Sequence, residues 1–123
     1  MFSNLSGASA ANVKLEDANL VCAILIGADL READLKSASL SVTKLTGANL
    51  QGADLSNADL SLADLERANL NEANFNNANL EHANLSGANL IDAKELKQEH
   101  LNRAYGDSRT AIPEGLTIPT KEN

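Results

Sequence analysis

The side chains that could carry out chemistry in this 123-residue chain are few, and most of them stand at multiples of five residues from one another. The aspartates at this spacing could suggest calcium binding or paired-carboxylate catalysis; they are Asp29, Asp34, Asp54, Asp59 and Asp64. Calcium-binding β-solenoids, however, use glycine-rich nonapeptides with regularly placed Asp, which this sequence lacks. Eight Asn occupy the same position of the spacing. We therefore interpret these carboxylates as hydrogen-bond partners of turns and solvent.

The remaining reactive side chains do not form a catalytic pattern. His82 and His100 have neither a nearby Cys nor a second His, so we expect both on the solvated surface. Cys22 is the single cysteine, which excludes an intrachain disulfide and a cysteine-rich metal cage. Phosphate-loop, dinucleotide-binding and nucleophile-elbow motifs are also missing. The sequence thus predicts a non-enzyme with no catalytic, cofactor-binding or metal-binding residues and no small-molecule substrate.

These residues are positioned by a strict pentapeptide repeat. Residues 3–92 divide into 18 consecutive five-residue units without an insertion. The central position is Leu in every unit except those of Ala10 and Phe75, and Ala lies two residues before it in 15 of the 18. Asn or Asp precedes the centre in 13 of the 18. A period of five would spread Leu around an α-helix and alternate it between the faces of a straight strand. All the Leu can point inward only if the chain turns once per unit around a common axis, as in a solenoid.

Units such as Ala48-Asn49-Leu50-Gln51-Gly52 resemble the A-(D/N)-L-x-x units of the pentapeptide-repeat family. The resemblance implies an all-β solenoid, a right-handed quadrilateral β-helix with four units per coil and about four and a half coils. Residues n and n+20 would then stack at one strand spacing. Such stacking predicts ion pairs between Lys14 and Asp34, Glu16 and Lys36, and Lys44 and Asp64. Ala10 lacks the volume of a Leu, so we expect the first coil to be the least stable.

One corner of the predicted coil is rich in glycine. Gly7, Gly27, Gly47 and Gly87 each follow a central residue by two positions, and Arg67 stands at the equivalent place. A type II turn requires a positive φ at its third residue. We therefore predict type II turns along this corner.

The repeat pattern ends at Ala93. Asp92 and Glu95 have the spacing of a capping box, with Ile91 and Leu96 as a hydrophobic staple, which predicts a helix from about 93 to 105 that Gly106 ends. Leu96, Leu101, Ala104 and Tyr105 would face the last coil. The segment resembles tails that follow many bacterial pentapeptide repeats, and the matching residues are Leu96, Gln98, Glu99, Leu101, Ala104, Gly106, Asp107, Pro113, Glu114, Gly115 and Leu116. We predict three parts: a repeat domain at 3–92, a capping helix and loop at 93–119, and a loose tail at 120–123.

The distribution of charge excludes several partners. The net charge is −7, and residues 3–92 contain 12 acidic and 5 basic side chains, whereas residues 93–123 contain 5 of each. A nucleic-acid binder needs a basic stripe, and an anionic membrane surface attracts basic residues, so neither partner is expected. The first residues do not read as a signal peptide, and no apolar run could span a bilayer. We expect a soluble, cytoplasmic protein.

One group of outward positions is unusually apolar. Positions that carry Ser, Asn, Gly or charge elsewhere carry Val21, Cys22, Ile24, Ile26, Val42 and Leu62 here, and clustered exposed apolar groups mark interfaces. The sequence predicts a non-catalytic structural or protein-interaction module, with these six residues as a candidate patch for a protein partner or for a homodimer near the N-terminal coils. The alternative is a DNA mimic that binds DNA gyrase, as some members of the resembled family do; the negative repeat domain agrees with it, while its short, uninterrupted repeats and interspersed basic residues do not.

Overall fold

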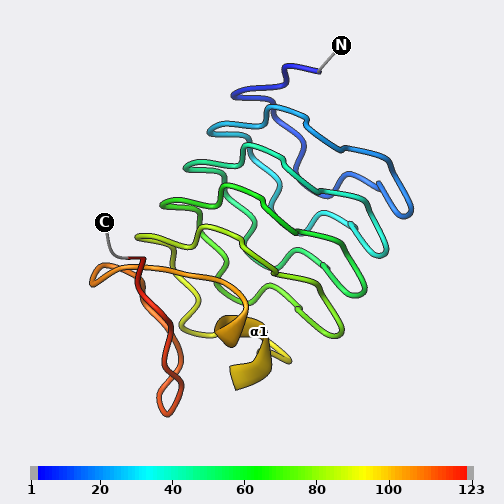
Figure 1. Ribbon diagram of the computed structural model, residues 1–123. Coiled ribbons are helices and arrows are strands. Elements are labelled where there is room, and N and C mark those ends of the chain that lie inside the picture. The colour runs from blue at the N-terminus through cyan, green and yellow to red at the C-terminus, as the bar shows by residue number, and fades with distance from the viewer. Residues whose placement is uncertain (1–2, 122–123) are drawn as a thin grey trace.

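The computed structural model describes residues 3–121, which wind into a rod of stacked coils (Figure 1). Single-residue parallel bridges join neighbouring coils, and there is one bridge on each of four sides: Asn4 with Ile24, Ser9 with Asp29, Lys14 with Asp34, and Asn19 with Ser39. The same pairing of residue n with residue n+20 continues without a gap to Asn74 and Lys94. One circuit of the rod therefore takes twenty residues, as the resemblance implied.

Backbone hydrogen bonds hold each coil to the next. The Leu5 N–H donates to the Ile24 carbonyl at 2.7 Å, and the Ile24 N–H donates to the Ser3 carbonyl at 2.8 Å. Each side is so short that the described residues form bridges rather than extended strands. The chain then turns, and the first turn is closed by the Ala8 N–H donating to the Leu5 carbonyl at 3.0 Å.

Every corner of the rod has a residue in the left-handed region. From Gly7 to Gly87 each fifth residue has a φ between 58° and 72°, whether or not it is glycine. This is the φ that the third residue of a type II turn requires. The type II geometry predicted for the glycine corner thus extends to all four corners, because each corner must turn the chain in the same way.

The Asp and Asn position stabilises these turns. In thirteen units the side-chain Oδ1 accepts the N–H of the residue two positions later. Asp54, for example, accepts the Ser56 N–H at 3.0 Å and the Ser56 hydroxyl at 2.6 Å. The five aspartates of the repeat all make this bond, which confirms their structural interpretation.

The interior of the rod is filled by the Leu and Ala positions. From Leu25 to Leu90 the central residues are fully buried, and Phe75 takes a Leu place without exposure. Thr43 replaces an Ala and satisfies its hydroxyl by donating to the Leu40 carbonyl at 2.7 Å. Burial of each Leu contributes about 1.5–3 kcal/mol, so this ladder is the main source of stability. The first coil is less complete, since 44% of Leu5 is exposed.

The C-terminal helix is shorter than predicted. Helix α1 comprises only Gln98–Asn102, instead of 93–105. Ladder pairing continues beyond Ala93, because the Lys94 N–H donates to the Ala73 carbonyl at 2.8 Å and the Lys94 carbonyl accepts the Phe75 N–H at 2.9 Å. Asp92 therefore belongs to a turn and cannot begin a helix. Gly106 does not end the helix either; its φ is not positive, and a Cβ there would lie 2.5 Å from the Thr110 hydroxyl.

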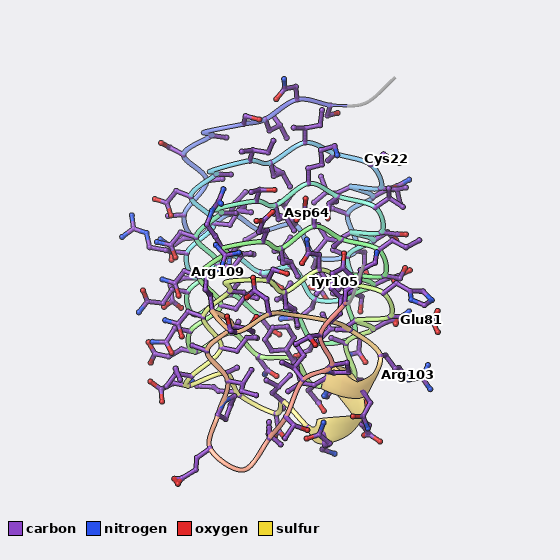
Figure 2. The ribbon with its side chains drawn as sticks, turned by 60° about the vertical axis from the view of Figure 1, so that its left-hand side comes forward. Cys22, Asp64, Glu81, Arg103, Tyr105 and Arg109 are labelled. Carbon is purple, nitrogen blue, oxygen red and sulfur yellow. The ribbon has the colours of Figure 1, made fainter. Side chains whose placement is uncertain are left out.

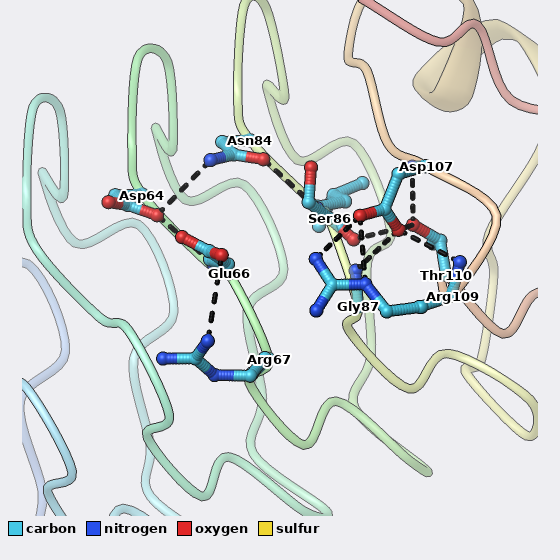
Figure 3. A network of polar contacts seen from close by, with 10 residues as sticks. Asp64, Glu66, Arg67, Asn84, Ser86, Gly87, Asp107, Arg109 and Thr110 are labelled. Carbon is cyan, nitrogen blue, oxygen red and sulfur yellow. Dashed lines mark hydrogen bonds and ion pairs between the residues drawn. The ribbon is translucent and has the colours of Figure 1, made fainter.

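The segment after α1 packs over the last coil. Leu101 and Ala104 are buried, and Tyr105 and Ala111 form bridges with Asn84 and Asn89. Thr110 donates its hydroxyl to the Leu85 carbonyl at 2.9 Å, and Asp107 accepts the Gly87 N–H at 3.1 Å (Figure 3). With the bridge of Lys94 to Asn74, the pairing between coils therefore continues beyond the Leu pattern on three sides of the rod.

His100 and Thr120 depart from the expectations for this segment. His100 was expected on the surface, but only 8% of it is exposed, and its Nδ1 accepts the Lys97 N–H at 2.9 Å. Thr120 forms a bridge with Gly106, so pairing reaches one residue into the segment predicted to be a loose tail, of which residues 122 and 123 lie outside the described part. Within residues 3–121, no helix combines the length and apolarity needed to cross a membrane.

Candidate interaction face

The six residues of the predicted patch lie on one side of the rod and the corners that bound it. We call this side the Ile24 face. Its mid-side column is Ile24, Lys44, Asp64 and Asn84, which successive bridges connect. The preceding corner supplies Val21 and Cys22, and the following corner supplies Ile26. Stacking at twenty residues then places Val42, Leu62 and His82 in one column with Cys22.

The large apolar side chains of this face are exposed to solvent. The exposed fraction is 57% for Leu62 and 45% for Val42, and Val21 and Ile26 are exposed to a similar extent. Cys22 and Ile24 are half-buried. The coil that begins with Val21 thus presents an apolar row across the whole face, and the apolar column continues through Val42 to Leu62.

The column of Cys22, Val42 and Leu62 also has an unfavourable backbone conformation. These residues have φ values of 63°, 60° and 60°, the left-handed region that Gly, Asn and Asp tolerate best. A β-branched residue such as Val42 is an outlier there. The other corners use mostly Gly, Asn, Asp, Ser or Glu at this position. Neither solvent exposure nor backbone preference therefore explains the apolar side chains of this column.

A hollow of about 760 Å³ lies at the C-terminal end of the Ile24 face. Leu62, Tyr105 and Pro119 form apolar parts of its lining. At its rim Arg103 lies 3.5 Å from the carboxylate of Glu81, and the Lys121 ammonium lies 4.9 Å from the centre of the Tyr105 ring. Figure 2 shows Cys22, Glu81 and Arg103 along the right-hand edge of the rod, with Asp64 and Tyr105 nearer the middle of the view.

The charged residues of the repeat pair with one another only within a unit, whereas Glu81 pairs with Arg103 of the segment that follows the repeat. Arg31 binds Asp29 at 2.7 Å and Lys36 binds Asp34 at 3.3 Å. The hydrogen bond from Arg31 lowers the pKa of Asp29 to about 2. The ion pairs predicted between stacked residues are not among those formed within residues 3–121; Asp34 and Lys36, which were each expected to pair with another coil, pair with each other instead. Such exposed pairs contribute at most about 1 kcal/mol each.

Two opposite charges on the Ile24 face lack such a partner. Lys44 is exposed, and Asp64 is half-buried. Asp64 accepts the Glu66 N–H at 3.1 Å and the Asn84 amide at 3.5 Å, as the network in Figure 3 shows. Neither Lys44 nor Asp64 belongs to an ion pair among the described residues.

Among residues 3–121, no three His, Cys, Asp or Glu side chains gather as metal ligands would. The structure brings the six predicted residues together, whereas the hollow beside them had no sequence signal. Its lining residues Arg103, Tyr105, Pro119 and Lys121 lie in the non-repeating segment, where no period relates them to the face.

Comparisons with known proteins agree with this architecture. A family model described as pentapeptide repeats matches residues 2–36, 23–61 and 58–94, in eight copies. A pentapeptide repeat protein from Nostoc Pcc 7120 has a similar crystal structure, with 28% identity over 96% of this chain and 84% of that one and a TM-score of 0.71. No curated protein matches the sequence.

Two further crystal structures match less closely in shape. A pentapeptide repeat protein from the cyanobacterium Cyanothece 51142 has 30% identity over 89% of this chain and 88% of that one, with a TM-score of 0.47. A pentapeptide repeat protein from the Arabidopsis thaliana thylakoid lumen has 31% identity over 79% of this chain and 70% of that one, with a TM-score of 0.39.

Proposed function

The chain belongs to the pentapeptide-repeat family, and we propose that it is a non-catalytic interaction module that binds a protein partner through the Ile24 face. In this proposal the repeat of residues 3–92 forms a rigid rod of about four and a half coils. The segment at 93–119 covers the C-terminal edge of the rod, since exposed edges invite aggregation.

One observation supports the choice of face above all others. Val42 and Leu62 are exposed and Cys22 is half-buried, and all three residues have a left-handed backbone conformation. A non-glycine residue in that conformation costs roughly 1–2 kcal/mol. These three residues are unfavourable for the isolated rod, and they recur at successive coils. A bound partner that covers them would explain their presence, since backbone outliers cluster at functional sites.

A binding assay with matched variants tests this proposal. Purified protein bearing an affinity tag would be used to capture partners, in parallel with Leu62→Glu and with Asn77→Glu as the control. Asn77 is an exposed residue at the same turn position on another side of the rod, with a φ of 59°. We expect wild type and Asn77→Glu to retain the same partner and Leu62→Glu to lose it. Equal capture by all three proteins would contradict the choice of face.

The contacts of the acidic side chains argue against the alternative of a gyrase-binding DNA mimic, although the repeat domain is negatively charged. The Asp carboxylates of the repeat are engaged with turn N–H groups, and Arg31 and Lys36 neutralise two of them. We therefore expect the protein to leave gyrase supercoiling unchanged. Inhibition that charge reversal at Asp54 and Asp59 relieves would restore the alternative.

A further inference from the structure

We propose that the partner of the Ile24 face is a second copy of this chain, bound antiparallel across a two-fold axis between the coils of Val42 and Leu62. This inference rests on the proposed function, because it names the partner of the same face. A two-fold dimer is the commonest way in which one surface patch is buried against itself.

The regular stacking of the rod determines which residues would meet. A two-fold axis that crosses the rod reverses the order of the coils and leaves each column opposite itself. Val42 then lies opposite Leu62 of the second copy, and Cys22 lies opposite His82 of the second copy. The two most exposed members of the apolar column are thus buried against each other, twice per dimer.

The charges of the mid-side column favour this arrangement. With antiparallel rods, Lys44 lies opposite Asp64 of the second copy, and the same contact forms again across the axis. With parallel rods, the mid-side column would bring Lys44 toward Lys44 and Asp64 toward Asp64, which is repulsive. Because neither residue is engaged in an ion pair within its own chain, both are available to the second copy.

The two ends of the face also differ from each other. The apolar row of Val21, Cys22 and Ile24 lies at one end of the face, and the hollow lined by Leu62, Tyr105 and Pro119 lies at the other. Reversal of the coils places the row of each copy over the hollow of the other. The second copy would therefore cover the hollow and the apolar row as well as the apolar column.

Charge reversal gives a test that only contacts between chains can satisfy. Analytical ultracentrifugation at tens of micromolar should show wild type as a dimer. Lys44→Asp alone and Asp64→Lys alone should each weaken the dimer about tenfold or more, and an equimolar mixture of the two variants should form a heterodimer. Lys14→Asp, at a stacked Lys on another side, should dimerise like wild type, and melting curves would show that all variants are folded.

A crosslink tests the direction of the two rods. His82→Cys introduces one thiol besides that of Cys22. Positions 22 and 82 of one chain are three coils apart, about 14 Å by strand spacing, whereas a disulfide needs Cα atoms within about 7 Å. Mild oxidation should therefore give a covalent dimer linked from Cys22 to position 82, and Asn77→Cys should give no link from Cys22 to position 77.

Each outcome decides the inference. A wild-type monomer overturns it, as does a Cys22–Cys22 crosslink in the wild-type dimer, because an axis between the coils of Val42 and Leu62 places the two Cys22 residues about three coils apart. Absence of the heterodimer after mixing also overturns it. A monomer that still captures another protein through Leu62 would leave the proposed function standing, and a dimer unaffected by Leu62→Glu would contradict the face itself.

Discussion

At the scale of single residues, the corner positions show which side chains are unfavourable for the stability of the rod and so need another explanation. The N–H of most corner residues donates to a carbonyl of the next coil, as that of Val42 does to the Ser61 carbonyl at 3.0 Å. The left-handed φ that this requires suits glycine and is unfavourable for Val. A corner residue that the backbone disfavours is therefore informative about what lies outside the rod.

Val42→Gly tests this reasoning. Relief of the left-handed conformation gains roughly 1–2 kcal/mol, and the greater freedom of unfolded glycine offsets about 0.5–1 kcal/mol of it. We expect the free energy of unfolding to rise by about 0.5–1 kcal/mol in denaturant melts, while self-association weakens. Ser41→Gly is the matched control, because Ser41 precedes Val42 in the same turn and has no positive φ. It should lower stability, and a loss in both variants would refute the backbone argument.

At the scale of elements, the first coil is the incomplete one. A cavity of about 220 Å³ near the N-terminal end of the rod has an entirely apolar lining that includes Leu5, Ala10 and Leu15. Ala10 stands at a central position where all other units have Leu or Phe. The first coil therefore buries less apolar surface than its successors.

Filling this cavity should stabilise the rod. Ala10→Leu restores the ladder at its weakest point, and cavity-filling changes commonly add about 0.5–2 kcal/mol. Thermal melts should show the increase. Ala48→Leu adds the same atoms at a fully buried Ala and should cost about 1–3 kcal/mol through overpacking. If both changes destabilise the protein equally, the cavity is not available to a side chain.

The C-terminal element contains a buried titratable group. Burial lowers the pKa of His100 below its usual value of 6.5, with smaller opposing contributions from Glu99 and from backbone groups. Protonation would also remove the lone pair with which Nδ1 accepts the Lys97 N–H. Since the folded pKa is the lower one, the contribution to stability is complete above pH 6.5 and is lost as the pH falls below it.

The melting temperature should accordingly decrease between about pH 7 and pH 5. His100→Gln should flatten this dependence, while His82→Gln, at an exposed position, should leave it intact. A decrease that persists in His100→Gln would assign the effect to another group. Asp29, Asp34 and Asp107 do not interfere, because their pKa values lie below the ordinary 3.8 and they titrate in a more acidic range.

These elements also show what the sequence could and could not predict. The repeat and the aspartate-to-turn bonds follow from residue types that recur at one position. The twenty-residue circuit was implied only by the resemblance to the pentapeptide-repeat family. The end of the ladder does not follow from either, because backbone pairing needs only N–H and carbonyl groups, and Lys94 supplies them without a Leu pattern. The burial of His100 and the hollow around Tyr105 depend on how a non-repeating segment packs, for which no period exists.

At the scale of the whole molecule, the number of residues between two positions determines whether they lie on the same side of the rod. Inserting one extra unit after Gly47 should leave the core intact, since inward Leu and Ala positions are kept, but should move Leu62 to the next side. Inserting a second copy of residues 28–47 there should lengthen the rod by one coil and keep Leu62 in the column of Val42. Both proteins should melt cooperatively, and only the first should lose the dimer in ultracentrifugation. Retention of the dimer by the first would show that the column is not the interface.

Because each residue pairs with the one twenty positions away, its place in the sequence determines the side of the rod on which it lies. A tandem duplication of five residues is harmless to the interior yet rotates everything downstream by a quarter turn, so an insertion far from a surface can dismantle it. Only insertions or deletions of a multiple of twenty residues keep every downstream residue on its original side. An outer surface of such a rod is therefore kept only when the chain is lengthened by whole coils of twenty residues. The core, in contrast, tolerates insertion of any number of five-residue units.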